Sequence, residues 1–253
     1  MRLLLHSFSA ALVAVLFFFS PIARAELPFL VDLPDTACAT SIPAAADWYA
    51  GVAAMPTATQ AGQRLALEID QGASVGFDVD TAGALHYRMA FNNVAEGWSW
   101  QPLAQPESED YYRWKFLPLQ SVSEARGDYV QEEKVGEPQK TRVEWRYDYF
   151  LAFDNPYDFY PRVVDDDAGF VARIAPVSAG AERGPLRLLA LATLVEPAVA
   201  ESTTFWKAIY SRPVDFTLKK RYLIARLEAL LVCDGASGRM LARIDPIQRA
   251  VQR

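Results

Sequence analysis

The chain has very little histidine, and this shortage excludes several kinds of metal and nucleophilic chemistry. Only His6 and His86 occur in 253 residues. A zinc site built from several histidines is therefore excluded, and two cysteines are too few to replace them. A Ser-His-Asp triad would have to use His86, and the chain has no GxSxG turn to hold the serine. We therefore expect His86 to be a structural or surface residue.

Phosphate-binding loops and redox motifs are absent as well. Neither GxxxxGK[ST] nor GxGxxG occurs, so nothing indicates nucleotide binding through such loops. No CxxC spacing is present, which leaves redox catalysis without support. The balance of 31 acidic against 25 basic residues disfavours nucleic acid as a partner.

Residues 1–25 have the pattern of a secretory signal peptide. Arg2 gives a positive start, an apolar run covers residues 3–19, and Ala23-Arg24-Ala25 matches the small-x-small cleavage pattern. We expect the exported chain to begin at Glu26 and to reach the periplasm or the extracellular medium. No later run of 18 apolar residues exists, so we do not expect a helical membrane protein after processing.

Residues 26–253 have a length that suits a single β-rich domain. Their charge is unevenly spread. Residues 26–170 hold 24 acidic and 10 basic residues, whereas residues 171–253 hold 7 acidic and 13 basic residues. This asymmetry indicates an acidic half and a basic half, as two faces, two subdomains or a self-complementary contact.

The two cysteines that follow the signal segment are Cys38 and Cys233. An even number of cysteines in an exported chain predicts a disulfide, which would tie the N-terminal segment to the end of the chain. The alternative is a pair of buried thiols that are not bonded.

The longest strand pattern lies between Arg142 and Phe153. Apolar and polar residues alternate there with a period of two, which predicts a half-buried strand. One face carries six apolar or aromatic side chains: Val143, Trp145, Tyr147, Tyr149, Leu151 and Phe153. Asp154-Asn155-Pro156 then ends the strand, because proline cannot continue a hydrogen-bonded ladder.

Alternating patterns predict strands over most of the remaining chain. They fall near residues 65–69, 75–79, 85–89, 112–116, 128–135 and 170–174, with a hairpin between the second and third. Residues 216–233 fit both a helix and a strand, and we favour a strand. A short helix over residues 45–52, capped by Ser41 or Ile42, is expected before Pro56. The predicted fold is mainly β, an antiparallel β-sandwich or open barrel with a short N-terminal helix.

A ligand site is predicted where the central strand ends. Asp154, Tyr157, Asp158 and Tyr160 follow one another closely there, and loops held by a rigid scaffold often carry binding residues. Aromatic rings would supply the apolar contact, and the carboxylates would fix the orientation of the ligand. The alternative is a core strand followed by an acidic, solvated turn.

Carboxylates allow two further kinds of chemistry. Asp165-Asp166-Asp167 and Asp78 with Asp80 resemble parts of calcium loops, but neither completes the EF-hand spacing. Calcium held by distant loops stays an alternative to a chain without a cofactor. Glu144 and Asp148 share a strand face, with α-carbons about 13 Å apart. This separation is wide for paired glycosidase carboxylates, and a charge ladder with neighbouring arginines explains them better.

Together these features predict an exported, non-catalytic binding or envelope-assembly protein of unknown ligand. An envelope glycan or an envelope protein would be its partner. One alternative is a carboxylate-dependent enzyme that acts on glycans, and another is an outer-membrane β-barrel.

Overall fold

The computed structural model describes residues 37–70, 75–79, 85–90, 115–131, 138–155, 158–159, 169–174 and 185–246. The predicted signal peptide, the turn at residues 80–84, the aromatic residues Trp98 and Trp100, and the acidic run at residues 165–167 lie outside this part of the chain.

The described residues are mainly β, which confirms the predicted fold class. Short helical segments come first: the 3-10 helix η1 (Ala37–Ala39), α1 (Ala45–Ala53) and α2 (Thr57–Gln60). Strands follow for the rest of the chain: β1 (Arg64–Glu68), β2 (Val75–Val79), β3 (Leu85–Ala90), β4 (Lys115–Gln131), β5 (Gln139–Phe153), β6 (Gly169–Ile174), β7 (Leu186–Trp206), β8 (Val214–Asp234) and β9 (Met240–Ile244).

The larger sheet has six strands in the order β1-β7-β8-β5-β4, and β9 also pairs with β8. Its pairs are antiparallel except for β5 and β8, which run parallel, so the sheet is mixed rather than wholly antiparallel. This parallel pair follows from the order of the strands, because β6 and β7 intervene before the chain returns beside β5. The described sheet is open, with β1 and β4 at its two ends.

The segment whose sequence fits both helix and strand, residues 216–233, lies within strand β8. In the body of the molecule both faces of β8 are buried. Leu223 and Leu227 enter the main core, while Tyr222 and Ile224 enter a second cluster on the other side. A strand buried on both faces has an almost continuous apolar sequence, and this removes the alternation that would have distinguished it from a helix.

Helix α1 covers one face of the sheet with Trp48 and Val52, which are both fully buried. The face of β5 predicted to be apolar meets it, with Tyr149, Leu151 and Phe153 in the same core. The prediction that Ser41 or Ile42 caps this helix is wrong, because the cap position is Ala44 and no side chain there bonds the helix.

A distant strand supplies the missing cap of α1. The backbone N–H of Ala46 donates to Oε1 of Gln120 on β4, at 3.0 Å. The first amides of a helix lack partners within the helix, so this contact satisfies one of them. Sequence reasoning looked for a local cap, whereas the fold uses a side chain 74 residues away.

The two strands predicted near residues 112–116 and 128–135 are not separate. Residues 115–131 form the single long strand β4, which pairs with β5 along its whole length. Its register shifts between Pro118 and Gln120 and again between Ala125 and Gly127. Each irregularity moves the alternation by one residue, which divides one strand into two apparent patterns.

The predicted partnership of Cys38 and Cys233 is confirmed by a disulfide, with α-carbons 5.5 Å apart. Both residues are buried in a small cluster with Leu189 and Leu231. The bond fastens η1 to the end of β8. The predicted hairpin of β2 and β3 is also present, with Val75 opposite Met89, and β6 completes this second, three-stranded sheet.

Candidate functional site

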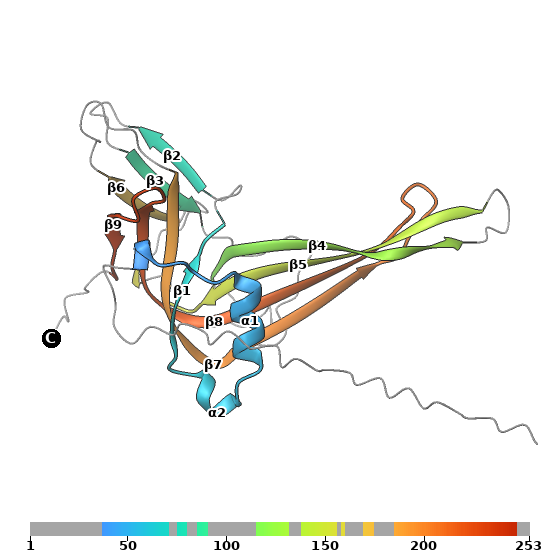
Figure 1. The fold of residues 1–253 in the computed structure, drawn as a ribbon, viewed down its shortest axis with the longest axis horizontal. Helices are drawn as coiled ribbons and strands as arrows, with labels where there is room; N and C mark the ends of the chain where they lie inside the picture. The colour runs from blue at the N-terminus through green and yellow to red at the C-terminus, as the bar shows by residue number, and fades with distance from the viewer. Residues whose placement is uncertain are drawn as a thin grey trace, which may run out of the picture.

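Four strands of the larger sheet continue past the core as an extension that we call the arm (Figure 1). It consists of residues 120–131 of β4, 139–148 of β5, 199–206 of β7 and 214–221 of β8, with the connection 207–213. Among the described side chains of these ranges, no apolar residue is buried. At the base of the arm, residues 195–198 form a bulge in β7, and bulged strands bend.

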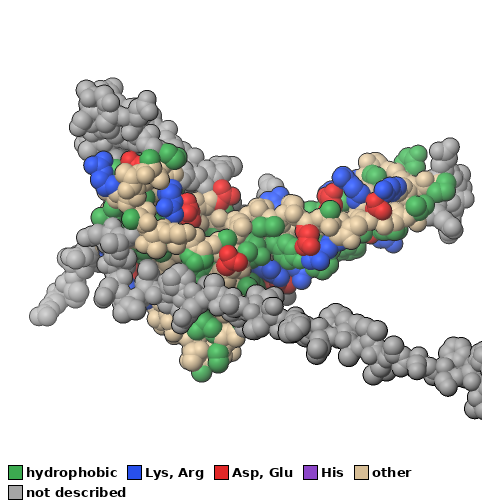
Figure 2. All heavy atoms as spheres, viewed as in Figure 1, with side chains coloured by type: hydrophobic (Ala, Val, Ile, Leu, Met, Phe, Trp, Pro, Cys, Tyr) green, Lys and Arg blue, Asp and Glu red, His purple; other side chains and the backbone are tan. Residues whose placement is uncertain are grey.

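Among the residues that the structure describes, exposed large hydrophobic side chains are confined to the arm. Within the described residues the molecule exposes seven of them, and all seven lie on the arm: Val122, Tyr129, Val130, Phe205, Trp206, Ile209 and Tyr210. Figure 2 shows such green side chains gathered toward the far end of the arm, beside blue lysine and arginine side chains. Apolar groups that gather on one projecting element are typical of a contact surface.

One face of the arm carries aromatic rings stacked with cations. The indole of Trp145 lies between Arg126 and Lys219, whose charged groups are 4.7 Å and 5.2 Å from its centre. Arg126 also donates to the hydroxyl of Tyr147 at 2.9 Å. These residues come from β4, β5 and β8, so the contacts join three strands that have no buried apolar layer to hold them.

Arg221 joins this face to the body of the molecule. Its guanidinium lies over the rings of Tyr147 and Tyr49, at 4.6 Å and 5.1 Å, and donates to Glu201 at 2.7 Å. Burial raises the pKa of Glu201, but hydrogen bonds from Arg221 and Lys219 outweigh it and hold that pKa below its ordinary value. Glu201 therefore stays ionised and keeps both cations in place.

The opposite face of the arm carries a ladder of charged side chains. Asp148 accepts hydrogen bonds from Arg146 at 2.7 Å and from Ser121 at 2.6 Å. Glu144 pairs with Arg142 at 3.3 Å. Each of the two carboxylates considered for glycoside chemistry thus has an arginine of its own, as the charge-ladder interpretation predicts.

The connection between β7 and β8 is a tight hairpin in the outer part of the arm, and the ends of β4 and β5 reach further out beside it (Figure 1). Ile209 and Arg212 exchange backbone hydrogen bonds of 3.0 Å and 2.9 Å, leaving Tyr210 and Ser211 at the turn. Asp215 fixes the base of this turn, because it accepts from the amide of Ala208 at 2.7 Å. Sequence reasoning missed this hairpin, although its signal is visible in the sequence as the apolar and basic run FWKAIYSR.

The structure describes only part of the ligand site that the sequence predicts at the end of β5. Asp154 and Asp158 are described, whereas Tyr157 and Tyr160 lie outside the described residues. The carboxylate of Asp158 accepts from Arg226 at 3.0 Å and from Asn155 at 3.1 Å. The intervening aromatic residue, Phe159, is 6% exposed and belongs to the main core. Asp158 is thus committed to contacts within the protein.

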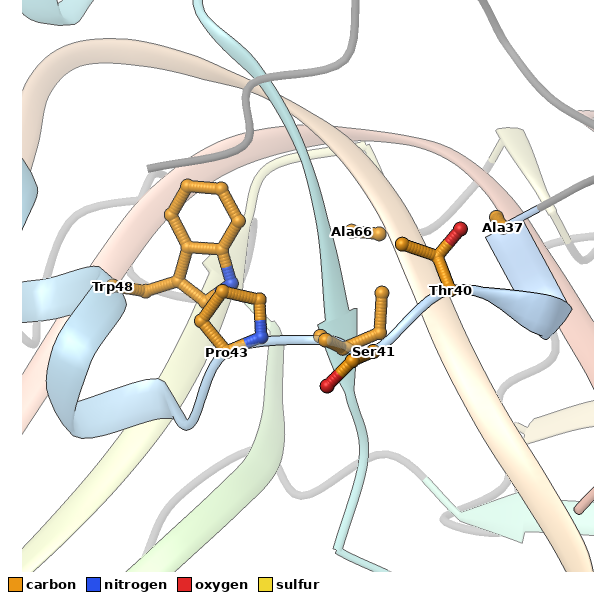
Figure 3. A pocket seen from close by; sticks show the side chains of 7 residues that line it. Ala37, Thr40, Ser41, Pro43, Trp48 and Ala66 are labelled. Carbon is orange, nitrogen blue, oxygen red and sulfur yellow. The ribbon is translucent and has the colours of Figure 1, made fainter. Parts of the chain in front are cut away.

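A small cavity lies between the N-terminal segment, α1 and β1 (Figure 3). Its volume is about 50 Å³. The lining is mostly apolar and consists of Ala37, Thr40, Ser41, Ile42, Pro43, Trp48 and Ala66.

In the part of the chain that the structure describes, no group of three or more histidine, cysteine or acidic residues is arranged to hold a metal ion. No helix in this part is long and apolar enough to cross a membrane.

Comparison of the chain with known protein families, with characterised proteins and with solved structures gives no match.

Proposed function

We propose that this chain is an exported, non-catalytic binding protein that makes contact through the arm. One observation carries the proposal: in the described residues, every exposed large hydrophobic side chain lies on the arm. An apolar side chain that is exposed to water changes the stability of the free protein little. It contributes strongly to the free energy of binding when a partner removes it from water.

The construction of the arm supports a role in contact. Its charged groups hold the strands to one another, as Glu201 of β7 does with Arg221 of β8 and Asp148 of β5 does with Ser121 of β4. An element held in one shape before binding loses less conformational entropy on binding. The exposed apolar side chains of the arm are then available to contact a partner.

The disulfide supports export. Disulfides persist in oxidising compartments and are rare in the cytosol. The bond between Cys38 and Cys233 lies in a buried cluster, where it fastens the N-terminal segment to β8. Such a bond suits a protein that folds outside the cytosol, in the periplasm or the medium. We infer an envelope glycan or an envelope protein as the partner.

Retention on envelope material tests the proposal. The exported protein is mixed with sacculi and with membrane fragments of the cell that exports it, and the bound fraction is measured after sedimentation. The arm variant carries Val130→Ser, Phe205→Ser and Ile209→Ser, and the control carries Ala54→Ser and Ala61→Ser, which are exposed positions of the body. We expect the arm variant to lose retention and the control to keep it. Equal retention of both proteins contradicts a contact through the arm.

A further inference from the structure

We propose that the β7–β8 hairpin of the arm inserts into the interface of an anionic phospholipid bilayer. This inference rests on the proposed role of the arm in contact, and it names the partner. The group involved, which we call the tip, consists of six residues of the β7–β8 hairpin: Phe205, Trp206, Lys207, Ile209, Tyr210 and Arg212.

The apolar side chains of the tip surround the hairpin instead of forming one flat patch. Tyr210 at the turn is 75% exposed and Ile209 beside it is 62% exposed. Phe205 and Trp206 are consecutive in a strand, so they project to opposite faces, and both are exposed. A protein surface that docked on one face would leave the other in water, whereas a lipid interface encloses a hairpin from all sides.

The two charged side chains of the tip, Lys207 and Arg212, are both cations, whereas the neighbouring β4–β5 hairpin carries Asp128, which pairs with Lys140 at 2.5 Å. Lys207 and Arg212 are exposed, and the sequence has no acidic residue between positions 202 and 214. The first carboxylate to follow, on Asp215, accepts from the amide of Ala208 and from the hydroxyl of Tyr129, at 2.7 Å and 2.9 Å. Two cations among aromatic side chains complement the headgroup region of an anionic bilayer, where tryptophan and tyrosine also accumulate.

Trp206 and the backbone of Tyr210 are held in place before any contact with a partner. Trp206 packs against Phe216 with ring centres 5.4 Å apart. The guanidinium of Arg212 lies over the ring of Phe216, 5.8 Å from its centre. Gln139 of the neighbouring hairpin donates to the carbonyl of Tyr210 at 3.0 Å. A fixed wedge of this kind loses little conformational entropy on entering an interface.

The position of the tip makes such insertion accessible. The arm strand β8 runs for seven residue steps from Arg221 to Val214, about 23 Å at 3.3 Å per residue. Figure 1 shows the smaller sheet at the opposite end of the molecule from this hairpin, and the helices beside the body of the larger sheet. The tip can therefore enter a bilayer surface while the body remains in water.

Vesicle sedimentation tests the proposal with the exported protein. Vesicles of phosphatidylcholine alone are compared with vesicles that also contain phosphatidylglycerol, at low and high salt. The charge variant is Lys207→Gln with Arg212→Gln, and its control is Arg226→Gln with Arg239→Gln on the body. The apolar variant is Ile209→Ser with Tyr210→Ser, and its control is Val122→Ser, which lies on the arm away from the tip.

We expect binding to the anionic vesicles that weakens at high salt. Each surface cation contributes about five-fold to such binding, so the charge variant should bind about 30-fold more weakly. The apolar variant should lose at least about ten-fold, and both controls should bind like the natural chain. A blue shift of tryptophan emission on vesicle addition should disappear in Trp206→Phe.

Three outcomes overturn the proposal. They are absence of vesicle binding, equal binding to neutral and anionic vesicles, and unchanged binding of the tip variants. If membrane fragments retain the protein through the tip only while their proteins are intact, the tip is a protein-docking surface and the lipid assignment is wrong. In that case, loss of retention in the arm variant still supports the proposed binding function, so the two proposals fail separately.

Discussion

The side-chain amide of Asn155 pairs with both backbone groups of Leu227. Its Nδ2 donates to the carbonyl of Leu227 at 2.8 Å, and its Oδ1 accepts from the N–H of Leu227 at 2.9 Å. The last backbone pair of the parallel ladder is Phe153 with Ala225. A side chain thus takes the place of the next backbone pair, which ends β5 without leaving the backbone of β8 unpaired.

Asn155→Ala should therefore destabilise the protein by about 2–3 kcal/mol, because it leaves a buried N–H and a buried carbonyl without partners. Urea unfolding measures the change. Arg226→Ala is the control, because it removes only an exposed ion pair with Asp158 and should cost less than about 1 kcal/mol. Equal effects of both substitutions would show that the amide contact has no special importance.

The strand-end site and the arm can be separated by parallel substitutions. Tyr157→Ala with Tyr160→Ala should leave the melting temperature nearly unchanged and weaken retention on envelope material if the strand end binds the ligand. The arm variant described above should weaken retention if the arm does. We expect the larger loss in the arm variant, because Asp158 of the strand-end group is already bonded within the protein. A larger loss in the tyrosine variant reverses this assignment.

The disulfide should account for a large part of the stability. Its two cysteines are 195 residues apart in sequence, and closing so long a loop lowers the entropy of the unfolded chain by an amount that corresponds to about 5 kcal/mol. Cys38→Ser with Cys233→Ser should shift the urea midpoint accordingly. Thiol titration of the unfolded, unreduced protein should find no free thiol, and two thiols per chain would show that the bond does not form.

Arg221→Lys should destabilise the base of the arm by about 1–2 kcal/mol. Lysine keeps the charge, but it lacks the planar group that stacks on Tyr49 and Tyr147 while it donates to Glu201. Amide hydrogen exchange in residues 199–206 and 214–221 should accelerate more than exchange in the core. Arg226→Lys, on an exposed pair, serves as the control and should change neither measurement.

Acid should weaken the contact between Glu228 and Arg64. Burial raises the pKa of Glu228, but hydrogen bonds from Arg64 and Thr193 outweigh it and lower that pKa below the ordinary value of 4.5. A lowered carboxyl pKa stabilises the fold above the ordinary value, and this contribution is lost as pH falls through the folded-state pKa. Glu228→Gln should cost about 1 kcal/mol at pH 7, and the two unfolding free energies should converge in acid. If the difference between the two unfolding free energies stays constant from pH 7 into acid, the proposed dependence on the ionisation of Glu228 is wrong.

The sequence by itself determined the local elements whose pattern is strong. Alternation in residues 142–153 predicted β5, because successive side chains of a strand point to opposite faces of the sheet. Burial departs from this alternation near the end of the strand, where Ala152 on the polar face is buried in the second cluster. Two cysteines in a chain with an export pattern predicted the disulfide, because no other partner exists for either residue.

Only the tertiary structure decided the contacts made between distant segments. The cap of α1 comes from Gln120, and the end of β5 is completed by Leu227, and neither partner is near in sequence. The arm was not predicted either, because its aromatic residues alternate like those of the core. Whether Trp145 or Leu151 is buried depends on whether a second layer of the protein packs on that part of the strand. Alternation of apolar and polar residues in the sequence does not show where such a layer is present.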